Sequence, residues 1–171
     1  MESKELLFDA YSHISRVVHQ AADGLSQEQL AYRPEEGSNS IAWLVWHLTR
    51  VQDSHLSAVT QLEEAWLDEG WSEKFGLPGT TSIGYGDGPE EVAAIRPDEE
   101  LLLGYHDYVA DRVLAYMDSV DAAELDRIVD TSYDPHVTAG VRLVSVISDN
   151  LQHAGQARYL RGMIERTGIG A

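Results

Sequence analysis

The sequence contains no cysteine, no long apolar run and few basic side chains. Without cysteine, disulfides and thiolate zinc sites are excluded, and nothing indicates an oxidising compartment. No stretch approaches the ~18 uninterrupted apolar residues that a membrane-spanning helix needs. The charged start, MESKELLFDAYSHI, lacks the apolar core of a signal peptide. We therefore expect a cytoplasmic protein.

Basic residues are few compared with acidic ones. Only 12 Lys and Arg residues stand against 29 Asp and Glu, which gives a formal net charge of −17. Nucleic acids and anionic membranes attract proteins through basic surfaces that displace counterions. We therefore expect neither as a partner, and we interpret most of the acidic residues as solvated helix faces.

The alternation of apolar and polar residues that indicates β-strands is also missing, and helical spacing takes its place. Apolar residues recur at helical intervals in four long segments, at about residues 4–22, 41–62, 98–120 and 141–165. A chain of 171 residues with 43% hydrophobic residues can bury one core. The sequence predicts one all-α domain over residues 1–171, a four-helix bundle.

A long connection, residues 63–97, separates the second predicted helix from the third. It contains six of the 14 glycines and three of the five prolines, together with Trp66, Trp71, Phe75 and Tyr85. Irregular loops of this length in compact domains are often functional. We expect short helical turns near residues 71–75 and 89–95, and either a lid over a binding site or a plug for the open end of the bundle.

The last predicted helix carries polar side chains where a bundle normally places apolar ones. Asp149, His153 and Gln156 fall within the same arc as Val146 and Leu160, so we expect this arc to face the core. Buried polar groups need partners. Asp149 and His153 are four residues apart, about 40° around a helix, so they can hold one ion together.

A third ligand must come from another helix, and His47 is the best candidate because it lies on the apolar stripe of the second helix, next to Trp43 and Leu44. A carboxylate and two imidazoles suit a first-row divalent metal in a bundle core. From these residues alone, the alternatives are a core histidine at position 47 and a helix-surface ion pair between Asp149 and His153.

Three further histidines are weaker candidates. His106 lies on the stripe of the third helix, where we interpret it as a core residue, and His55 is too far around its helix from His47. We expect His136, which follows Pro135 in a loop, to lie at the surface.

Two motifs add a resemblance to these patterns. The stretches NSIAWLVWHL and SDNLQHAGQARYLRGMI resemble the DinB-like superfamily, which includes YfiT-type metal-dependent hydrolases and the N-terminal domain of mycothiol-dependent maleylpyruvate isomerase. The resemblance covers most of the chain and implies a three-residue metal site formed by His47, Asp149 and His153. YfiT-type members carry His, and the isomerase Glu, where this chain has Asp149.

The resemblance implies a metal-dependent enzyme that uses a low-molecular-weight thiol of the mycothiol or bacillithiol type, as an S-transferase or an isomerase. Zn or Ni best suits the ligands, and the metal would activate the thiol. A metal-dependent hydrolase and a non-catalytic metal- or ligand-binding module are the alternatives. We expect a small-molecule substrate, and a homodimer because bundles of this kind often pair.

Four further side chains are expected around the metal. Gln156 is predicted either to hydrogen-bond a ligand or to join two helices through a buried amide. Trp43 shares the helix face of His47, while Trp71 and Phe75 could roof the pocket or close the end of the bundle.

Overall fold

Four long helices form the body of the protein. The computed structural model describes residues 2–80 and 82–169, and its long helices are α1 (Ser3–Ala22), α3 (Ile41–Thr60), α7 (Glu99–Asp118) and α9 (Ala139–Thr167). These are the four segments that the apolar spacing predicts, and the all-α fold is confirmed. Ser40, Asp98 and Thr138 accept hydrogen bonds from backbone N–H groups in the first turns of α3, α7 and α9, as expected of helix caps.

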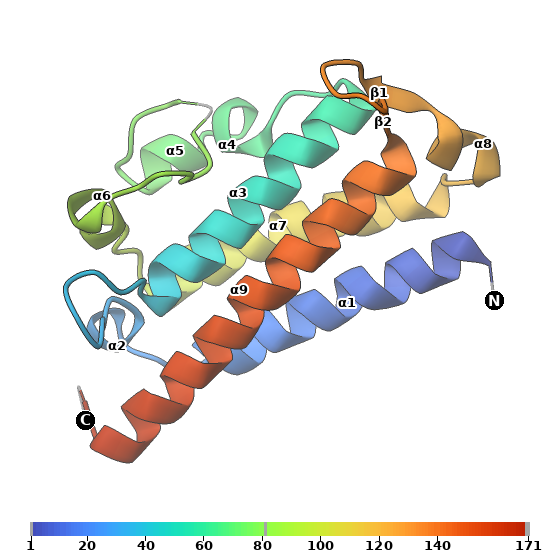
Figure 1. Ribbon diagram of the computed structural model, residues 1–171. Helices are drawn as coiled ribbons and strands as arrows, with labels where there is room; N and C mark the ends of the chain where they lie inside the picture. The colour runs from blue at the N-terminus through green and yellow to red at the C-terminus, as the bar shows by residue number, and fades with distance from the viewer. Residues whose placement is uncertain (1, 81, 170–171) are drawn as a thin grey trace.

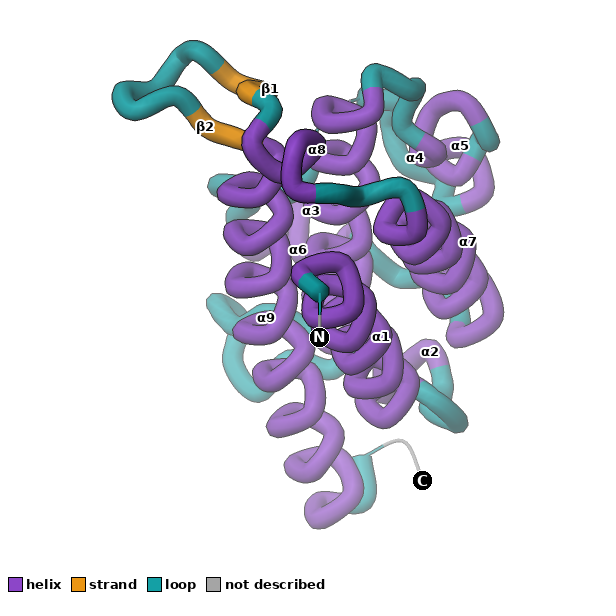
Figure 2. The backbone as a smooth tube through the Cα atoms, turned by 90° about the vertical axis from the view of Figure 1, so that its right-hand side faces the viewer, coloured by secondary structure: helices purple, strands orange, loops and turns teal. Residues whose placement is uncertain are grey.

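The long helices pack so that α9 and α7 each contact both α1 and α3. Along the colour gradient of Figure 1, α3 and α7 run in the same direction, whereas α1 and α9 run in the opposite one. Figure 2 shows the same bundle from its side, with α1 between α9 and α7. Because two parallel helices cannot be joined by a tight turn, the chain needs a long return between α3 and α7.

That return covers α3. It contains the short helices α4 (Ala65–Asp68), α5 (Trp71–Lys74) and α6 (Pro89–Ala94), which lie beside α3 in Figure 1. Every residue from Ser40 to Asp53 is buried as a result. Helical spacing places Arg50 and Asp53 away from the apolar stripe of α3, yet both are buried, because the connection covers the helix face that they occupy.

Asp53 anchors the return to α3. Its carboxylate accepts hydrogen bonds from the backbone N–H groups of Ala65 and Trp66, at 2.9 and 2.8 Å, and from the Tyr105 hydroxyl at 3.0 Å. The guanidinium of Arg50 lies 3.2 Å from Asp53 and 2.6 Å from Glu64. The charges of this buried cluster are thus paired, as buried charges require.

Two smaller elements precede the main helices, and a hairpin precedes α9. Helix α2 (Gln27–Leu30) lies between α1 and α3 in the chain, and α8 (Ala122–Asp126) follows α7. The sequence shows no alternation typical of strands, but the segment after α8 contains two short antiparallel strands, β1 (Ile128–Asp130) and β2 (Val137–Thr138). Ile128 pairs with Thr138 and Asp130 with Val137.

The core stripe of α9 is displaced from the predicted arc. The buried residues of this helix are centred on Asn150, Ala154 and Ala157. Asp149 and His153 are only partly buried, and Gln156 is exposed. The predicted arc therefore lies at the edge of the core, in the groove between α9 and α3. Tight helix packing explains the shift, because the small side chains of Ala154 and Ala157 let neighbouring helices approach closely.

Helix α9 ends at Gly168, whose φ of +66° is the left-handed conformation typical of helix C-termini. Among the described residues, no helix is both long enough and apolar enough to cross a membrane.

His106 is a fully buried histidine in α7 that has a single hydrogen-bond partner among the described residues. The Thr49 hydroxyl donates to the Val45 carbonyl and so accepts from Nδ1 of His106 at 3.0 Å. Its Nε2 is buried and has no hydrogen-bond partner in the part of the chain that the structure describes. Burial, as the main cause, lowers the pKa of His106 to about 4. The core-residue interpretation of His106 agrees with this environment.

Replacing Asp53 with alanine should lower the free energy of unfolding by about 3–5 kcal/mol, because Arg50 would remain buried with one carboxylate fewer. Chemical denaturation would measure the loss. The exposed Asp111→Ala on α7 is the control and should change stability by less than about 0.5 kcal/mol. Equal effects of the two variants would contradict the anchoring role of Asp53.

His106 should make the protein less stable in acid. Its folded pKa lies below that of an unfolded histidine, near 6.5, so the unfolded state binds the extra proton as the pH falls from about 6.5 to about 4. As the pH falls through this range, the free energy of unfolding of His106→Leu should therefore rise by up to about 3 kcal/mol relative to that of wild type. Denaturation at several pH values measures the difference, and the exposed His136→Gln serves as the control. A pH-independent difference between His106→Leu and wild type would contradict the assignment.

Candidate metal centre

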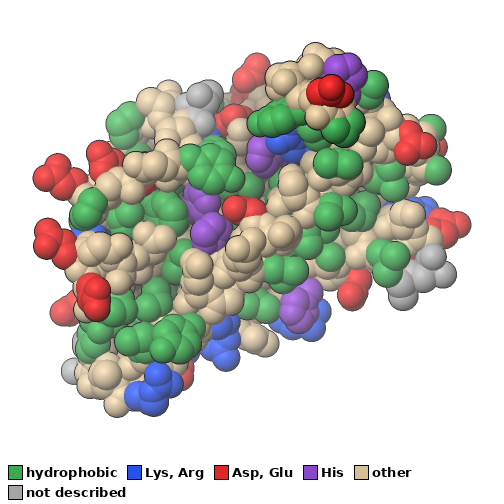
Figure 3. Space-filling view, viewed as in Figure 1, with side chains coloured by type: hydrophobic (Ala, Val, Ile, Leu, Met, Phe, Trp, Pro, Cys, Tyr) green, Lys and Arg blue, Asp and Glu red, His purple; other side chains and the backbone are tan. Residues whose placement is uncertain are grey.

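Three side chains from two helices converge in the groove between α3 and α9. The ligand-type atoms of His47, Asp149 and His153 all lie within 4.8 Å of one another. Nε2 of His153 is 3.6 Å from Oδ1 of Asp149, and Nε2 of His47 is 4.0 Å from Oδ2. Figure 3 shows histidine side chains gathered beside an acidic one in the middle of this face.

The helix geometry explains the convergence. His47 lies in the first half of α3, and Asp149 and His153 lie one turn apart on the edge of α9 that faces α3. The two helices pack against each other along this edge. The structure thus brings together the three residues that the sequence analysis selected.

Each imidazole is oriented by a hydrogen bond on its other nitrogen. Nδ1 of His47 donates to the backbone carbonyl of Ile83, and Nδ1 of His153 donates to Oε1 of Gln156 at 3.0 Å. With Nδ1 protonated, Nε2 of each neutral ring carries a lone pair that points into the cluster. Metal-binding histidines in proteins are usually held by such a bond.

Aromatic rings enclose His47. Trp43 stacks on its ring at a centroid distance of 4.7 Å and an angle of 6°, and Tyr85 meets the ring edge at 5.4 Å. Nε1 of Trp43 donates to the Asp87 carboxylate at 2.9 Å, which ties the residue 82–87 segment to α3. His47 is 1% exposed, whereas Asp149 and His153 are partly exposed, so the cluster is open on the side of Asp149 and His153.

The two imidazoles have opposite pKa shifts. Burial lowers the pKa of His47, despite the bond to Ile83 and the nearby Asp149 that raise it. Asp149 raises the pKa of His153, and the bond to Gln156 adds to this effect. His47 is therefore neutral at pH 7 and presents a lone pair, as a metal ligand must.

The carboxylate of Asp149 shows that the residues present fit a cation. Its Oδ2 is buried and has no hydrogen-bond partner within the described residues. It faces the Nε2 lone pair of His47 rather than a donor. A buried, unpaired carboxylate oxygen is costly, and one cation between these atoms would satisfy the carboxylate and both imidazoles at once.

Two aromatic residues that were candidates for this pocket lie elsewhere. Trp71 packs on Tyr105 and Tyr108, and Phe75 packs on Trp66 and Tyr105. Together they cover the side of α3 that carries the Arg50–Asp53 cluster. Their position therefore agrees better with the alternative prediction, in which they close the end of the bundle. The aromatic connection does approach the candidate site, but it does so through Tyr85.

The other histidines are not part of the cluster. His55 is partly buried and lies near Arg142, which together with burial lowers its pKa. His136 is exposed, and its Nδ1 donates to the Tyr133 carbonyl at 2.9 Å.

Three contributors to the site escaped the sequence analysis: the Ile83 carbonyl, Gly84 and Tyr85. Gly84 has a φ of +92°, and a Cβ at this position would lie 3.0 Å from Trp46, 3.1 Å from Trp43 and 3.2 Å from Nδ1 of His47. The segment Gly84-Tyr85-Gly86, an aromatic residue between two glycines, was the available signal. Nothing in the linear sequence, however, places it next to His47.

Replacing Gly84 with alanine should destabilise the protein by about 2–5 kcal/mol, through left-handed strain of about 1–2 kcal/mol and overpacking of about 1–3 kcal/mol. Gly86, with a φ of +84° and nothing within 4 Å of its Cβ position, provides a matched control. Gly86→Ala should be destabilised by the left-handed backbone strain alone. Chemical denaturation and near-ultraviolet circular dichroism would compare the two variants, and equal losses would show that the contact with Trp43 and His47 is unimportant.

Comparisons with known proteins agree with this architecture. A family model described as mycothiol S-transferase matches residues 7–166. The crystal structure of a conserved protein from Enterococcus faecalis is similar, with a TM-score of 0.86 and 29% sequence identity over 94% of this chain and 96% of that chain. Among curated proteins, none matches significantly. The match over most of the chain shows that this protein belongs to the mycothiol S-transferase family, within the DinB-like superfamily.

Proposed function

We propose that this protein is a divalent-metal-dependent S-transferase that joins a low-molecular-weight thiol of the mycothiol type to a small electrophile. One observation carries the proposal: His47, Asp149 and His153 bring ligand-type atoms of two imidazoles and one carboxylate within 4.8 Å of one another, and Oδ2 of Asp149 is buried without a hydrogen-bond partner among the described residues. In a chain of this family, such a cluster is the natural place for thiol activation.

The donor set favours Zn or Ni as the bound metal. Two imidazole nitrogens and one carboxylate oxygen suit both ions. Ligand atoms that share one tetrahedral cation are about 3.4 Å apart, so the ligand-type atoms of the three residues, which all lie within 4.8 Å of one another, would have to move closer together by side-chain rotation. Three protein ligands leave a coordination position open, as in catalytic sites.

The cation, when bound, would supply a Lewis acid that lowers the pKa of a thiol. The residues of the chain provide its setting. Ile83 and Gln156 hold the two imidazoles in place, so the ligands are oriented before a substrate arrives. Trp43 and Tyr85 exclude water from the His47 side, which strengthens electrostatic interactions in the site.

The same geometry could serve a metal-dependent hydrolase, with water in place of the thiol, or a module that binds metal without turnover. The family match favours the thiol. A cytoplasmic location and a homodimer remain predictions. A small-molecule substrate agrees with the family, and the net charge of −17 gives no support to nucleic acid as a partner.

Removing one ligand should abolish both metal binding and activity. We expect about one Zn or Ni per chain in wild-type protein purified without chelator, and little in His153→Ala, because two ligands hold a divalent metal weakly. Elemental analysis measures the metal. Conjugation of mycothiol to 1-chloro-2,4-dinitrobenzene, followed by absorbance, measures the activity, which we expect to fall at least about 100-fold in the variant.

The exposed His136→Ala is the matched control and should keep both metal and activity. Full activity of the metal-free wild type, or of His153→Ala, would disprove the metal-dependent mechanism. Tight metal binding without thiol binding would favour the non-catalytic module, and hydrolysis without conjugation would favour the hydrolase.

A further inference from the structure

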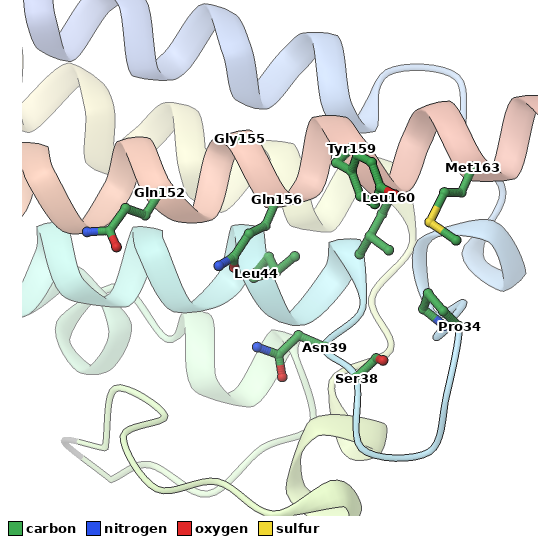
Figure 4. A pocket seen from close by; sticks show the side chains of 10 residues that line it. All are labelled: Pro34, Ser38, Asn39, Leu44, Gln152, Gly155, Gln156, Tyr159, Leu160 and Met163. Atoms are coloured by element: carbon green, nitrogen blue, oxygen red, sulfur yellow. The ribbon is translucent and has the colours of Figure 1, made fainter.

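A groove of about 720 Å³ follows α9 from Gln152, the residue before His153, toward the C-terminal end of the helix. Figure 4 shows its walls, formed by α9, the first turn of α3 and the connection before α3. The side chains of α9 that line it extend from Gln152 to Met163, which corresponds to about 16 Å along a helix. This length suits a small molecule with several functional groups.

Gln156 connects the groove to the metal ligands. Its side chain lines the groove next to Leu44, as Figure 4 shows, and its Oε1 accepts the hydrogen bond from Nδ1 of His153. Leu44 lies one helical turn before His47. A molecule in the groove would therefore have one end within reach of the three ligands.

The lining of the groove carries no charged side chain, although 24% of the residues in this chain are charged. Its polar members are the amides of Asn39, Gln152 and Gln156 and the hydroxyl groups of Ser38 and Tyr159. Amides and hydroxyls both donate and accept hydrogen bonds. Such a surface matches the hydroxyl and amide groups of an uncharged ligand, and it offers no counter-charge to a carboxylate.

Gly155 provides an independent observation. It lies in the middle of α9, where glycine is a poor helix former. A Cβ at this position would meet nothing within 4 Å, and its φ is not in the left-handed region. Neither backbone conformation nor helix packing therefore requires glycine there. Gly155 lines the groove. A side chain at this position would occupy the groove, so glycine leaves that space open.

We propose that this groove binds the uncharged, hydroxyl- and amide-bearing body of the thiol co-substrate, and that Gly155 keeps the groove open. The proposal rests on the proposed function above, because the thiol sulfur would then lie at His47, Asp149 and His153. It also assigns a selectivity, since a thiol that carries carboxylates would meet an uncharged wall in a strongly acidic protein.

The test fills the groove with a side chain. Gly155→Phe should place a ring in the space without changing the metal ligands. Gly162→Phe is the matched control: it is the same substitution two turns later in α9, outside the groove lining, and its Cβ would meet only the flexible end of Arg166, at 3.2 Å. Measurements of metal content and thermal denaturation would check that both variants are folded and contain metal.

Calorimetric titration of the zinc-loaded proteins with mycothiol measures the affinity directly. We expect binding to be weakened at least about tenfold by Gly155→Phe and changed less than about twofold by Gly162→Phe. In turnover assays, the KM for mycothiol should rise in Gly155→Phe while the KM for 1-chloro-2,4-dinitrobenzene changes little. Wild type should bind glutathione, which carries two carboxylates, at least about tenfold more weakly than mycothiol.

Each contrary outcome has a distinct meaning. Unchanged mycothiol binding by Gly155→Phe, with wild-type turnover intact, overturns the groove assignment and leaves the proposed function standing. A rise in the KM of the electrophile alone overturns the assignment to the thiol, as does a change in oligomeric state without a change in thiol affinity. Equal affinity for glutathione overturns the claim of selectivity. If zinc-loaded wild type binds no thiol, both this proposal and the proposed function fail.

Discussion

The parallel course of α3 and α7 is the constraint on which the rest of the structure depends. Because both helices run the same way, the chain must return along the bundle between them, and the described residues of the segment between α3 and α7 make that return against α3. A helix that would otherwise have one solvent face is covered on all sides from Ser40 to Asp53. Buried polar groups on that covered face need partners, and the returning segment provides them.

The return serves α3 at two places. Near its middle, the backbone N–H groups of Ala65 and Trp66 bind the Asp53 carboxylate. Nearly two turns earlier in α3, the Ile83 carbonyl fixes the ring of His47. The first contact holds the segment down, and the second uses it to orient a candidate ligand. Structural anchoring and site organisation thus come from the same stretch of chain.

The displaced core stripe of α9 has a functional consequence. If Asp149, His153 and Gln156 faced the centre of the core, they would be sealed from any substrate. At the edge of the stripe they remain partly accessible, with Asn150 and Ala154 packed inside and the groove along Gly155 and Gln156 outside. Half-burial lets Asp149 and His153 take part in a desolvated cluster while one side stays open to a small molecule.

The sequence by itself determined the helices and the identity of the candidate ligands. Apolar spacing located the four long helices, because this signal depends on local geometry. Asp149 and His153 were recognisable as a pair for the same reason, since a spacing of four residues fixes their relative direction on any helix. His47 stood out as a polar residue on an apolar stripe.

Only the tertiary structure decided what surrounds these residues. It placed Arg50 and Asp53 inside, moved Trp71 and Phe75 away from the site, and brought Ile83, Gly84 and Tyr85 onto His47. These outcomes depend on where a long irregular segment lies, and no periodic pattern encodes that position. The physical reason is that periodicity records one face of one helix, whereas contacts between distant segments follow from the packing of the whole bundle.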